Sequence, residues 1–124
     1  MNTMYEVNPT KAFALIQDGA LLVDVREPGE VSKKSFDVAN IIMIPSGELK
    51  KRFREIPLDC RIIIACRTGI RSAMATRFLL NHGYTQAVNM QKGIVNWEKD
   101  GLPVTREQQK TSGSWLKKIF GRQS

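Results

Sequence analysis

A short stretch of the chain, CRTGIRSA at residues 66–73, combines one thiol with two guanidinium groups. A thiol reacts as the thiolate, and neighbouring cations or a helix N-terminus favour that form. Arg67 and Arg71 lie in the same turn as Cys66, and Gly69 allows the backbone to fold tightly there. Such a loop can direct several backbone N–H groups at one anion, either a phosphate or a negatively charged group carried by the cysteine. The residues therefore predict a nucleophilic cysteine in an anion-binding loop.

The loop lies between an apolar run and a helical segment, so the surrounding elements must position it. Strands are expected at residues 4–7, 20–26, 39–45, 61–66 and 85–90, and helices at 8–19, 46–56, 72–83 and 93–101, with one short helical turn in 27–34. The runs LLV, IIMI and III are continuous rather than alternating, as in strands buried on both faces. The alternation of strands and helices predicts an α/β fold, with about five mostly parallel strands in one sheet and helices on both faces.

The ends of two helices are marked by their residues. Asn8 is a suitable N-cap, Pro9 fits the first helical position, and Gly19 follows the last turn. Ser46 is expected to cap the helix at 46–56 in the same way.

In open α/β sheets, sites form beyond the carboxyl ends of the strands. Cys66 ends one apolar run, and Asp24 and Arg26 lie at the corresponding end of another. An ion pair that holds the strand ends explains Asp24 and Arg26 better than a catalytic role does. Ser72 either contacts the site or only caps the following helix. Cys60 lies at the far end of the same strand as Cys66, roughly 20 Å away at about 3.3 Å per residue, so it is not expected to react with Cys66.

The chain resembles the single-domain rhodaneses, the thiosulfate sulfurtransferase family. The resemblance covers roughly residues 4–104 and rests on LLVDVREPGE, on IPSGEL, and on the segment from IIIACRTGIRSA to the Gly93-x-x-x-Trp97 pattern. It implies that Cys66 accepts the outer sulfur of a donor and holds it as a persulfide. It also implies that Arg67, Thr68, Gly69, Ile70 and Arg71 bind the donor through backbone N–H groups and guanidinium charge, and that Asp24, Arg26 and Ser72 support the site. No cofactor and no metal are implied.

The resemblance also suggests the substrates. Four residues separate Cys66 from Arg71, whereas related phosphatases have five, and the shorter loop suits sulfur better than a phosphate ester. Arg67 directly after the cysteine resembles loops that use thiosulfate rather than mercaptopyruvate. The expected partners are a small anionic sulfur donor and a thiol or cyanide acceptor, with a protein as a further possible acceptor. Two alternatives remain: a slow or non-catalytic sulfur carrier or partner-binding module, and a phosphatase or arsenate reductase.

One segment departs from the family pattern. Rhodaneses often have Gly-His-Ile-Pro-Gly-Ala before the middle strand, where this chain has FDVANI, so Asp37 replaces the histidine and Asn40 replaces a glycine. Asn tolerates left-handed geometry, so the turn is expected to persist with Asn40 in that conformation. The effect of Asp37 stays open.

The composition is ordinary for a soluble globular protein, with 42% hydrophobic and 25% charged residues. No apolar run approaches the roughly 20 residues of a membrane span, and two cysteines are too few for a disulfide framework, so a cytoplasmic protein is expected. A rhodanese-like domain is expected at residues 1–104, followed by a basic tail at 105–124. The tail holds five Lys/Arg and one acidic residue, so it supplies more than half of the chain's net charge of +7. The domain that precedes it does not show the basic stripe of a nucleic-acid binder. Residues 114–122 form a short amphipathic segment that either contacts a membrane surface or partner, packs on the domain, or is disordered.

Overall fold

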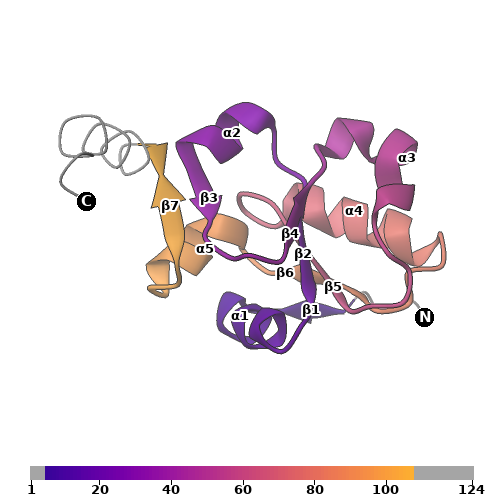
Figure 1. The fold of residues 1–124 in the computed structure, drawn as a ribbon, viewed down its shortest axis with the longest axis horizontal. Helices are drawn as coiled ribbons and strands as arrows, with labels where there is room; N and C mark the ends of the chain where they lie inside the picture. Colours follow the sequence, from indigo (N-terminus) through magenta and orange to yellow (C-terminus); the bar gives the residue numbers. More distant parts are fainter. Residues whose placement is uncertain (1–4, 108–124) are drawn as a thin grey trace, which may run out of the picture.

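The structure of the protein, a computed structural model, describes residues 5–107 of the 124-residue chain. Five strands form a central sheet in the order β1-β6-β5-β2-β4, and every neighbouring pair is parallel (Figure 1). The strands are β1 (Glu6–Val7), β2 (Leu21–Asp24), β4 (Ile41–Met43), β5 (Ile62–Ala65) and β6 (Ala87–Met90). The predicted parallel sheet is confirmed. Because β2 and β5 are neighbours, the ends that carry Asp24 and Cys66 lie side by side.

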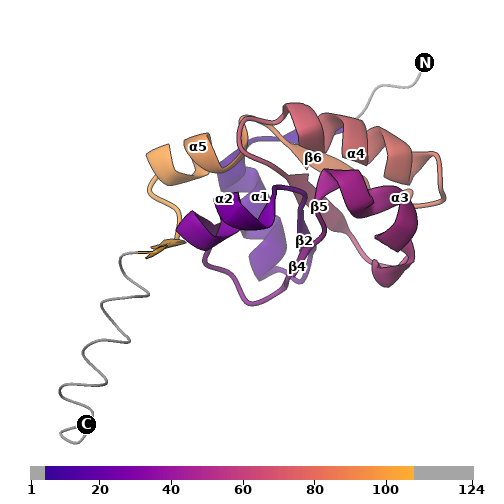
Figure 2. The ribbon, with the colours of Figure 1, turned by 90° about the horizontal axis from the view of Figure 1, so that it is seen from above.

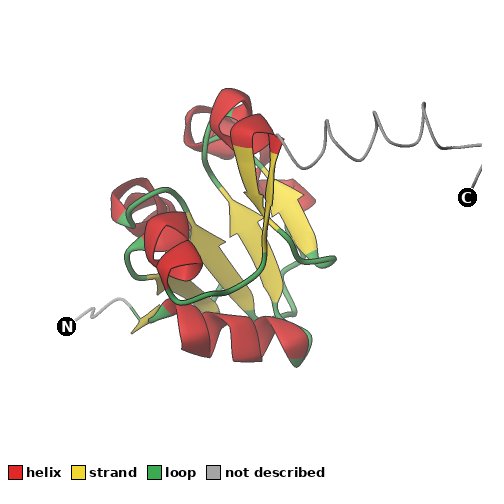
Figure 3. Cartoon of the chain, turned by 90° about the vertical axis from the view of Figure 1, so that its left-hand side faces the viewer, coloured by secondary structure: helices red, strands yellow, loops and turns green. Residues whose placement is uncertain are grey.

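Helices cover both faces of this sheet (Figures 2 and 3). The long helices are α1 (Pro9–Gln17), α4 (Ile70–Leu80) and α5 (Gly93–Lys99). Successive residues of β5 point to opposite faces: Ile62 and Ile64 pack in one core cluster with Leu79, whereas Ile63 packs in another with Trp97. This two-sided burial explains why the strand sequences are continuously apolar.

The first helix has the ends that its sequence predicted. The Asn8 Oδ1 atom accepts a hydrogen bond of 2.8 Å from the backbone N–H of Lys11, and Pro9 is the first helical residue. Gly19 follows the helix with a φ of 108°, in the left-handed region that a glycine adopts without a Cβ clash.

The expected single helix at 46–56 is wrong in detail. The segment forms a 3₁₀ turn η1 (Ser46–Glu48), a short α3 (Leu49–Arg52) and a second 3₁₀ turn η2 (Phe53–Glu55). Ser46 does not cap it, because Ser46 already lies inside η1 and its backbone N–H donates to the Val25 carbonyl at 2.9 Å. The backbone leaves α-helical geometry near Glu48 and again near Arg52, with φ values of −105° and −117°.

The run IIMI was expected to be buried on both faces, and this is wrong for its first three residues, although Ile44 is fully buried. β4 is the edge strand of the sheet, so its residues are only partly covered and Met43 is 48% exposed. A continuous apolar sequence does not distinguish a central strand from an edge strand.

A two-stranded antiparallel ribbon lies beside the sheet and was not predicted. It pairs β3 (Lys34–Phe36), which directly follows α2 (Pro28–Lys33), with β7 (Val104–Arg106). Each strand has three residues, too few for a periodic pattern. β7 continues the fold two residues past the expected boundary at residue 104. Residues 108–124 of the expected tail, including residues 114–122, lie outside the described residues. None of the helices in residues 5–107 has the length and apolar character needed to span a lipid bilayer.

Candidate active site

The cysteine loop joins β5 to α4 at the carboxyl edge of the sheet (Figure 1). Cys66 directly follows β5, and α4 begins at Ile70, two residues earlier than expected, so Arg71 lies in its first turn. Gly69 occupies the N-cap position with a φ of 101°, as its place in the tight turn suggested. A Cβ atom there would lie 2.9 Å from the backbone nitrogen of Lys92, so glycine is also needed for close packing.

Several hydrogen-bond donors converge on the Cys66 thiol. The backbone N–H groups of Gly69 and Ser72 donate to Sγ at 3.1 and 3.4 Å. Sγ lies 3.3 Å from Ser72 Oγ, to which it donates as a thiol and from which it can accept as a thiolate. Burial of the thiol raises its pKa, since Cys66 is 1% exposed. The hydrogen bonds from the Ser72 hydroxyl and from the N–H groups of Ser72, Gly69 and Thr68 outweigh burial, so the net pKa of Cys66 is below its ordinary value. The loop therefore favours the thiolate.

The contribution of the Ser72 hydroxyl to the lowered pKa of Cys66 can be tested by substitution. The thiolate is the form that reacts with iodoacetamide, so alkylation slows as the pH falls through the pKa of Cys66. Ser72→Ala removes the hydroxyl and keeps the N–H donor, so the pKa should rise and the profile should shift to higher pH. At pH 7 we expect alkylation of Cys66 to slow about three- to tenfold, as for one lost hydrogen bond.

Cys60 is the internal reference for this measurement. Burial and the charge of Asp59 raise the pKa of Cys60, and the Ser72 substitution does not alter either cause. Peptide mass mapping would follow both cysteines in one sample. An unchanged profile for Cys66 in Ser72→Ala would contradict the assigned role of the hydroxyl and leave Ser72 as a helix residue only.

The first turn of α5 fixes the backbone of Cys66. The N–H of Ile94 donates to the Cys66 carbonyl at 3.0 Å, and the N–H of Val95 donates to the Arg67 carbonyl at 3.2 Å. Gly93 makes this approach possible, because a Cβ atom at residue 93 would lie 2.3 Å from the Cys66 carbonyl oxygen. The glycine of the Gly93-x-x-x-Trp97 pattern thus serves the site as well as the fold.

Asp24 and Arg26 form the ion pair that their positions suggested. Arg26 Nη2 lies 2.8 Å from Asp24 Oδ2, and Arg26 Nε lies 3.0 Å from Asp24 Oδ1, with both residues buried. Arg26 Nη1 also donates to the Glu30 carbonyl at 3.4 Å. The pair joins the end of β2 to α2, which supports the edge of the site without contacting the thiol.

The two arginines of the loop differ in their surroundings. Arg71 donates from Nη1 and Nη2 to the two carboxylate oxygens of Glu30 at 2.7 and 2.8 Å. This hydrogen bond from Arg71 outweighs burial and lowers the pKa of Glu30 to about 2. Arg67 is exposed, and its guanidinium has no hydrogen-bond or ion-pair partner within residues 5–107. Glu30 was not among the residues expected at the site, because nothing in its local sequence reveals the contact with Arg71.

The remaining loop residues contribute mainly through the backbone. Thr68 is exposed, and its N–H lowers the pKa of Cys66. The Ile70 side chain is 71% exposed and points away from the core. Behind the loop, Asn89 Nδ2 donates to the Gly69 carbonyl at 3.4 Å and to Glu6 Oε2 at 3.1 Å. Sequence analysis missed Asn89, although its place near the carboxyl end of a neighbouring strand was a usable indication.

The turn in the FDVANI segment is stabilised in a different way from the one expected. Among residues 5–107, Lys92 is the one non-glycine residue with a positive φ, so Asn40 does not adopt left-handed geometry. Asn40 Nδ2 instead donates to the carbonyls of Gly19 and Ala20, at 3.3 and 2.9 Å, which fixes the turn through the side chain. Asp37 is exposed, and its backbone N–H donates to the Pro103 carbonyl at 3.0 Å.

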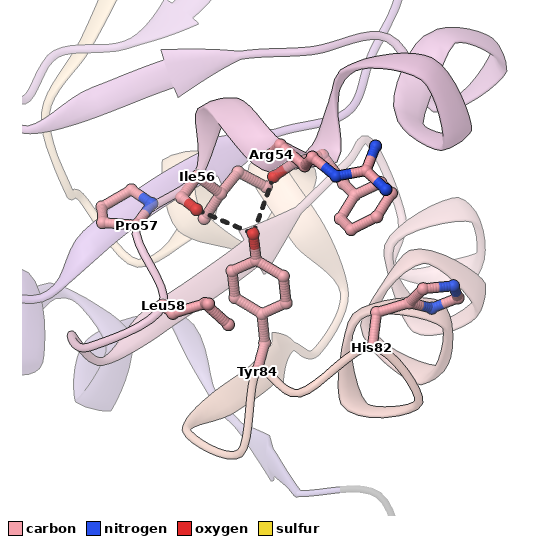
Figure 4. A pocket seen from close by; sticks show the side chains of 7 residues that line it. Arg54, Ile56, Pro57, Leu58, His82 and Tyr84 are labelled. Atoms are coloured by element: carbon pink, nitrogen blue, oxygen red, sulfur yellow. Dashed lines mark hydrogen bonds between the residues drawn. The ribbon is translucent and has the colours of Figure 1, made fainter.

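A separate pocket of about 530 Å³ lies where η2 meets the end of α4 (Figure 4). The Tyr84 hydroxyl donates to the carbonyls of Phe53 and Ile56, at 2.8 and 2.7 Å, and Arg54 stacks over the Phe53 ring. Neither cysteine lines this pocket. Within residues 5–107, no group of three or more His, Cys, Asp or Glu residues is arranged to hold a metal ion.

Comparison with known proteins agrees with this arrangement. A family model described as Rhodanese-like domain matches residues 8–100. A sulfurtransferase from Allochromatium vinosum is 34% identical over 87 residues, which cover 70% of this chain and 79% of that protein. The thiosulfate sulfurtransferase GlpE from Haemophilus influenzae is 29% identical over 103 residues, covering 80% of this chain and 92% of that protein. The crystal structure of a rhodanese-related protein from Thermoplasma volcanium matches with a TM-score of 0.74 at 32% identity, covering 82% of this chain and 97% of that one. With a cysteine loop that joins β5 to α4 and with these matches over most of its length, the chain belongs to the family of rhodanese-like domains.

Proposed function

We propose that this chain is a sulfurtransferase that carries a sulfane sulfur on Cys66. The observation behind the proposal is the convergence of the Gly69 and Ser72 N–H groups and the Ser72 hydroxyl on Sγ, at 3.1 to 3.4 Å. The same donors can stabilise the negative charge of a terminal persulfide sulfur, as an oxyanion hole does for oxygen.

The reaction divides into two balanced half-reactions. The Cys66 thiolate attacks the outer sulfur of thiosulfate or a similar donor, the donor S–S bond breaks, and sulfite leaves with the bonding electron pair. An acceptor thiolate or cyanide then attacks the terminal sulfur, thiocyanate forms in the case of cyanide, and the Cys66 thiolate is restored. Both nucleophiles are already anionic, so the scheme needs no general base. Arg67 attracts the anionic donor to the loop.

The partners follow from this chemistry. We expect a small anionic donor and a thiol, cyanide or protein acceptor, in the cytoplasm. A slow sulfur carrier remains the main alternative, since the same loop could hold a persulfide without rapid turnover. A phosphatase or arsenate reductase is less well supported, because only four residues separate Cys66 from Arg71.

Steady-state kinetics with thiosulfate and cyanide tests the proposal. A ping-pong mechanism gives parallel double-reciprocal lines, with sulfite and thiocyanate formed in equal amounts. Persulfide formation without multiple turnovers would favour the carrier alternative. Hydrolysis of p-nitrophenyl phosphate without thiocyanate formation would reject sulfur transfer in favour of a phosphatase.

Arg67→Ala should weaken the use of thiosulfate. The substitution removes an exposed cation, and the loss of a charge-assisted contact should lower kcat/KM for thiosulfate about ten- to a hundredfold. Arg71→Ala should lower the same constant, because it removes a cation and leaves Glu30 unpaired beside the donor. Arg77→Ala, at an exposed position late in α4, is the control. Wild-type kinetics in both loop variants would remove the donor-binding role of the arginines.

A further inference from the structure

Glu30 and Arg71 form a two-point ion pair beside the cysteine loop. The two Nη atoms of Arg71 meet the two Oε atoms of Glu30 at 2.7 and 2.8 Å. Arg71 comes from the first turn of α4, and Glu30 comes from α2, so the contact spans 41 positions of sequence. The side chains are 35% and 30% exposed, so a donor that enters the loop can approach them.

Other contacts fix the Glu30 carboxylate in this position. The Glu27 backbone N–H donates to Glu30 Oε1 at 3.0 Å, and the Glu30 carbonyl accepts a hydrogen bond from the buried Arg26. Glu30 is thus held at the start of α2 and by the Asp24–Arg26 pair. These contacts fix the position of the Glu30 negative charge beside the loop.

This pair changes the charge that a donor meets. Glu30 offsets Arg71, so within residues 5–107 the loop arginine without an ion-pair partner is Arg67. A thiosulfate dianion brings two negative charges close to the Glu30 carboxylate. A donor with one negative charge, such as a thiosulfonate or an alkyl persulfide, meets less repulsion.

We propose that Glu30 is a specificity-determining residue, which sets the donor preference through its two-point contact with Arg71. It favours monoanionic donors over the thiosulfate dianion. The inference rests on the proposed sulfur transfer by Cys66. With a thiosulfonate the step is balanced in the same way: the Cys66 thiolate takes the outer sulfur, the S–S bond breaks, and a sulfinate leaves with the electron pair.

A matched pair of donors tests the proposal. Thiosulfate and the methanethiosulfonate ion, CH₃SO₂S⁻, have the same transferable sulfur on a sulfonyl group and differ by one charge. KM for each donor is measured in the full-length chain with cyanide as acceptor. In Glu30→Gln we expect KM for thiosulfate to fall about three- to tenfold, as for the removal of one nearby charge, while KM for methanethiosulfonate falls by about the square root of that factor, roughly two- to threefold, because the interaction energy is proportional to the donor charge. The difference between the donors should shrink as salt is added.

Two further variants make the result specific. Glu55→Gln removes the same charge from an exposed residue of η2 that pairs with Arg52, and its KM ratio should stay close to that of the wild type. Arg71→Gln leaves the Glu30 carboxylate unpaired, so its ratio should move in the opposite direction, against thiosulfate. A residue with only a structural role would change both donors alike. Equal changes for both donors in Glu30→Gln, or shifts in the same direction in Glu30→Gln and Arg71→Gln, would overturn the proposal.

The outcome separates this inference from the function on which it rests. If neither donor loads sulfur onto Cys66 of the wild type, the proposed sulfur transfer fails. If both donors load Cys66 and the KM ratio is the same in wild type and Glu30→Gln, only the role of Glu30 fails. Should Glu30→Gln not fold, Glu30→Ala removes the same charge, and an unchanged KM ratio in that variant contradicts the role of Glu30.

Discussion

Cys66→Ser should lower the rate of sulfur transfer from thiosulfate to cyanide by at least about a thousandfold, to the level of the uncatalysed reaction. The serine hydroxyl fits the space of the thiol, but it stays protonated at neutral pH and cannot form a persulfide. The backbone N–H groups that donate to the sulfur of Cys66 can also donate to the oxygen of a serine, so the variant should fold. Thiocyanate formation, followed against time, is the measurement.

Cys60→Ser is the matched control for this prediction. Cys60 precedes β5 and does not contact Cys66, and both cysteines are free thiols. Its substitution should leave the rate of sulfur transfer within about twofold of the wild type, as for a surface change away from the site. Substantial activity in Cys66→Ser, or a comparable loss in Cys60→Ser, would be incompatible with Cys66 as the sole nucleophile.

Gly93→Ala should destabilise the protein by at least about 3 kcal/mol and lower its melting temperature by more than about 10 °C. The added Cβ atom would lie 2.3 Å from the Cys66 carbonyl oxygen and 2.5 Å from the Arg67 carbonyl oxygen. Both neighbours are backbone atoms, so no side chain can rotate to make room. The φ of 55° at this residue adds strain for alanine. Because the clash falls on the backbone of Cys66, the folded fraction should also lose activity.

Gly47→Ala is the matched control for the stability measurement. A Cβ atom at Gly47 meets nothing within 4 Å, and the residue is exposed in η1. Its free energy of unfolding should stay within about 0.5 kcal/mol of the wild type. Thermal and urea denaturation of the three proteins gives both quantities. A Gly93→Ala protein with wild-type stability would show that α5 does not pack against the cysteine loop as described.

The sequence was sufficient to predict the parallel sheet and the place of Cys66 at its carboxyl edge. The continuous run at β5 reflects burial on both faces, which Ile63 and Ile64 confirm by packing in opposite core clusters. The end of that run placed Cys66 at the carboxyl edge of the sheet. The same rule brought Asp24 and Arg26 to this edge, where they form the expected ion pair. These features depend on local periodicity and on one topological rule.

Other features depend on contacts that local sequence does not contain. Glu30 and Arg71 form an ion pair although 41 positions separate them in the sequence. The residues around a glutamate in a short helix do not indicate which distant arginine it will contact. β4 lies at the edge because it is the last strand in the order of the sheet. The apolar residues around Met43 do not indicate this order. Asn40 fixes its turn through its side-chain amide, although the conformational preference of asparagine suggested a left-handed backbone. Tertiary contacts decided each of these cases.

The role of Cys66 as carrier of the transferred sulfur can be read from intact mass spectrometry. The wild-type chain is incubated with thiosulfate, freed of donor and weighed before and after the addition of cyanide. This role predicts a gain of about 32 Da, one sulfur, which cyanide removes and which Cys66→Ser does not show. A Cys66→Ser protein that gains the same mass, or a wild type that gains none from thiosulfate or methanethiosulfonate, would contradict it.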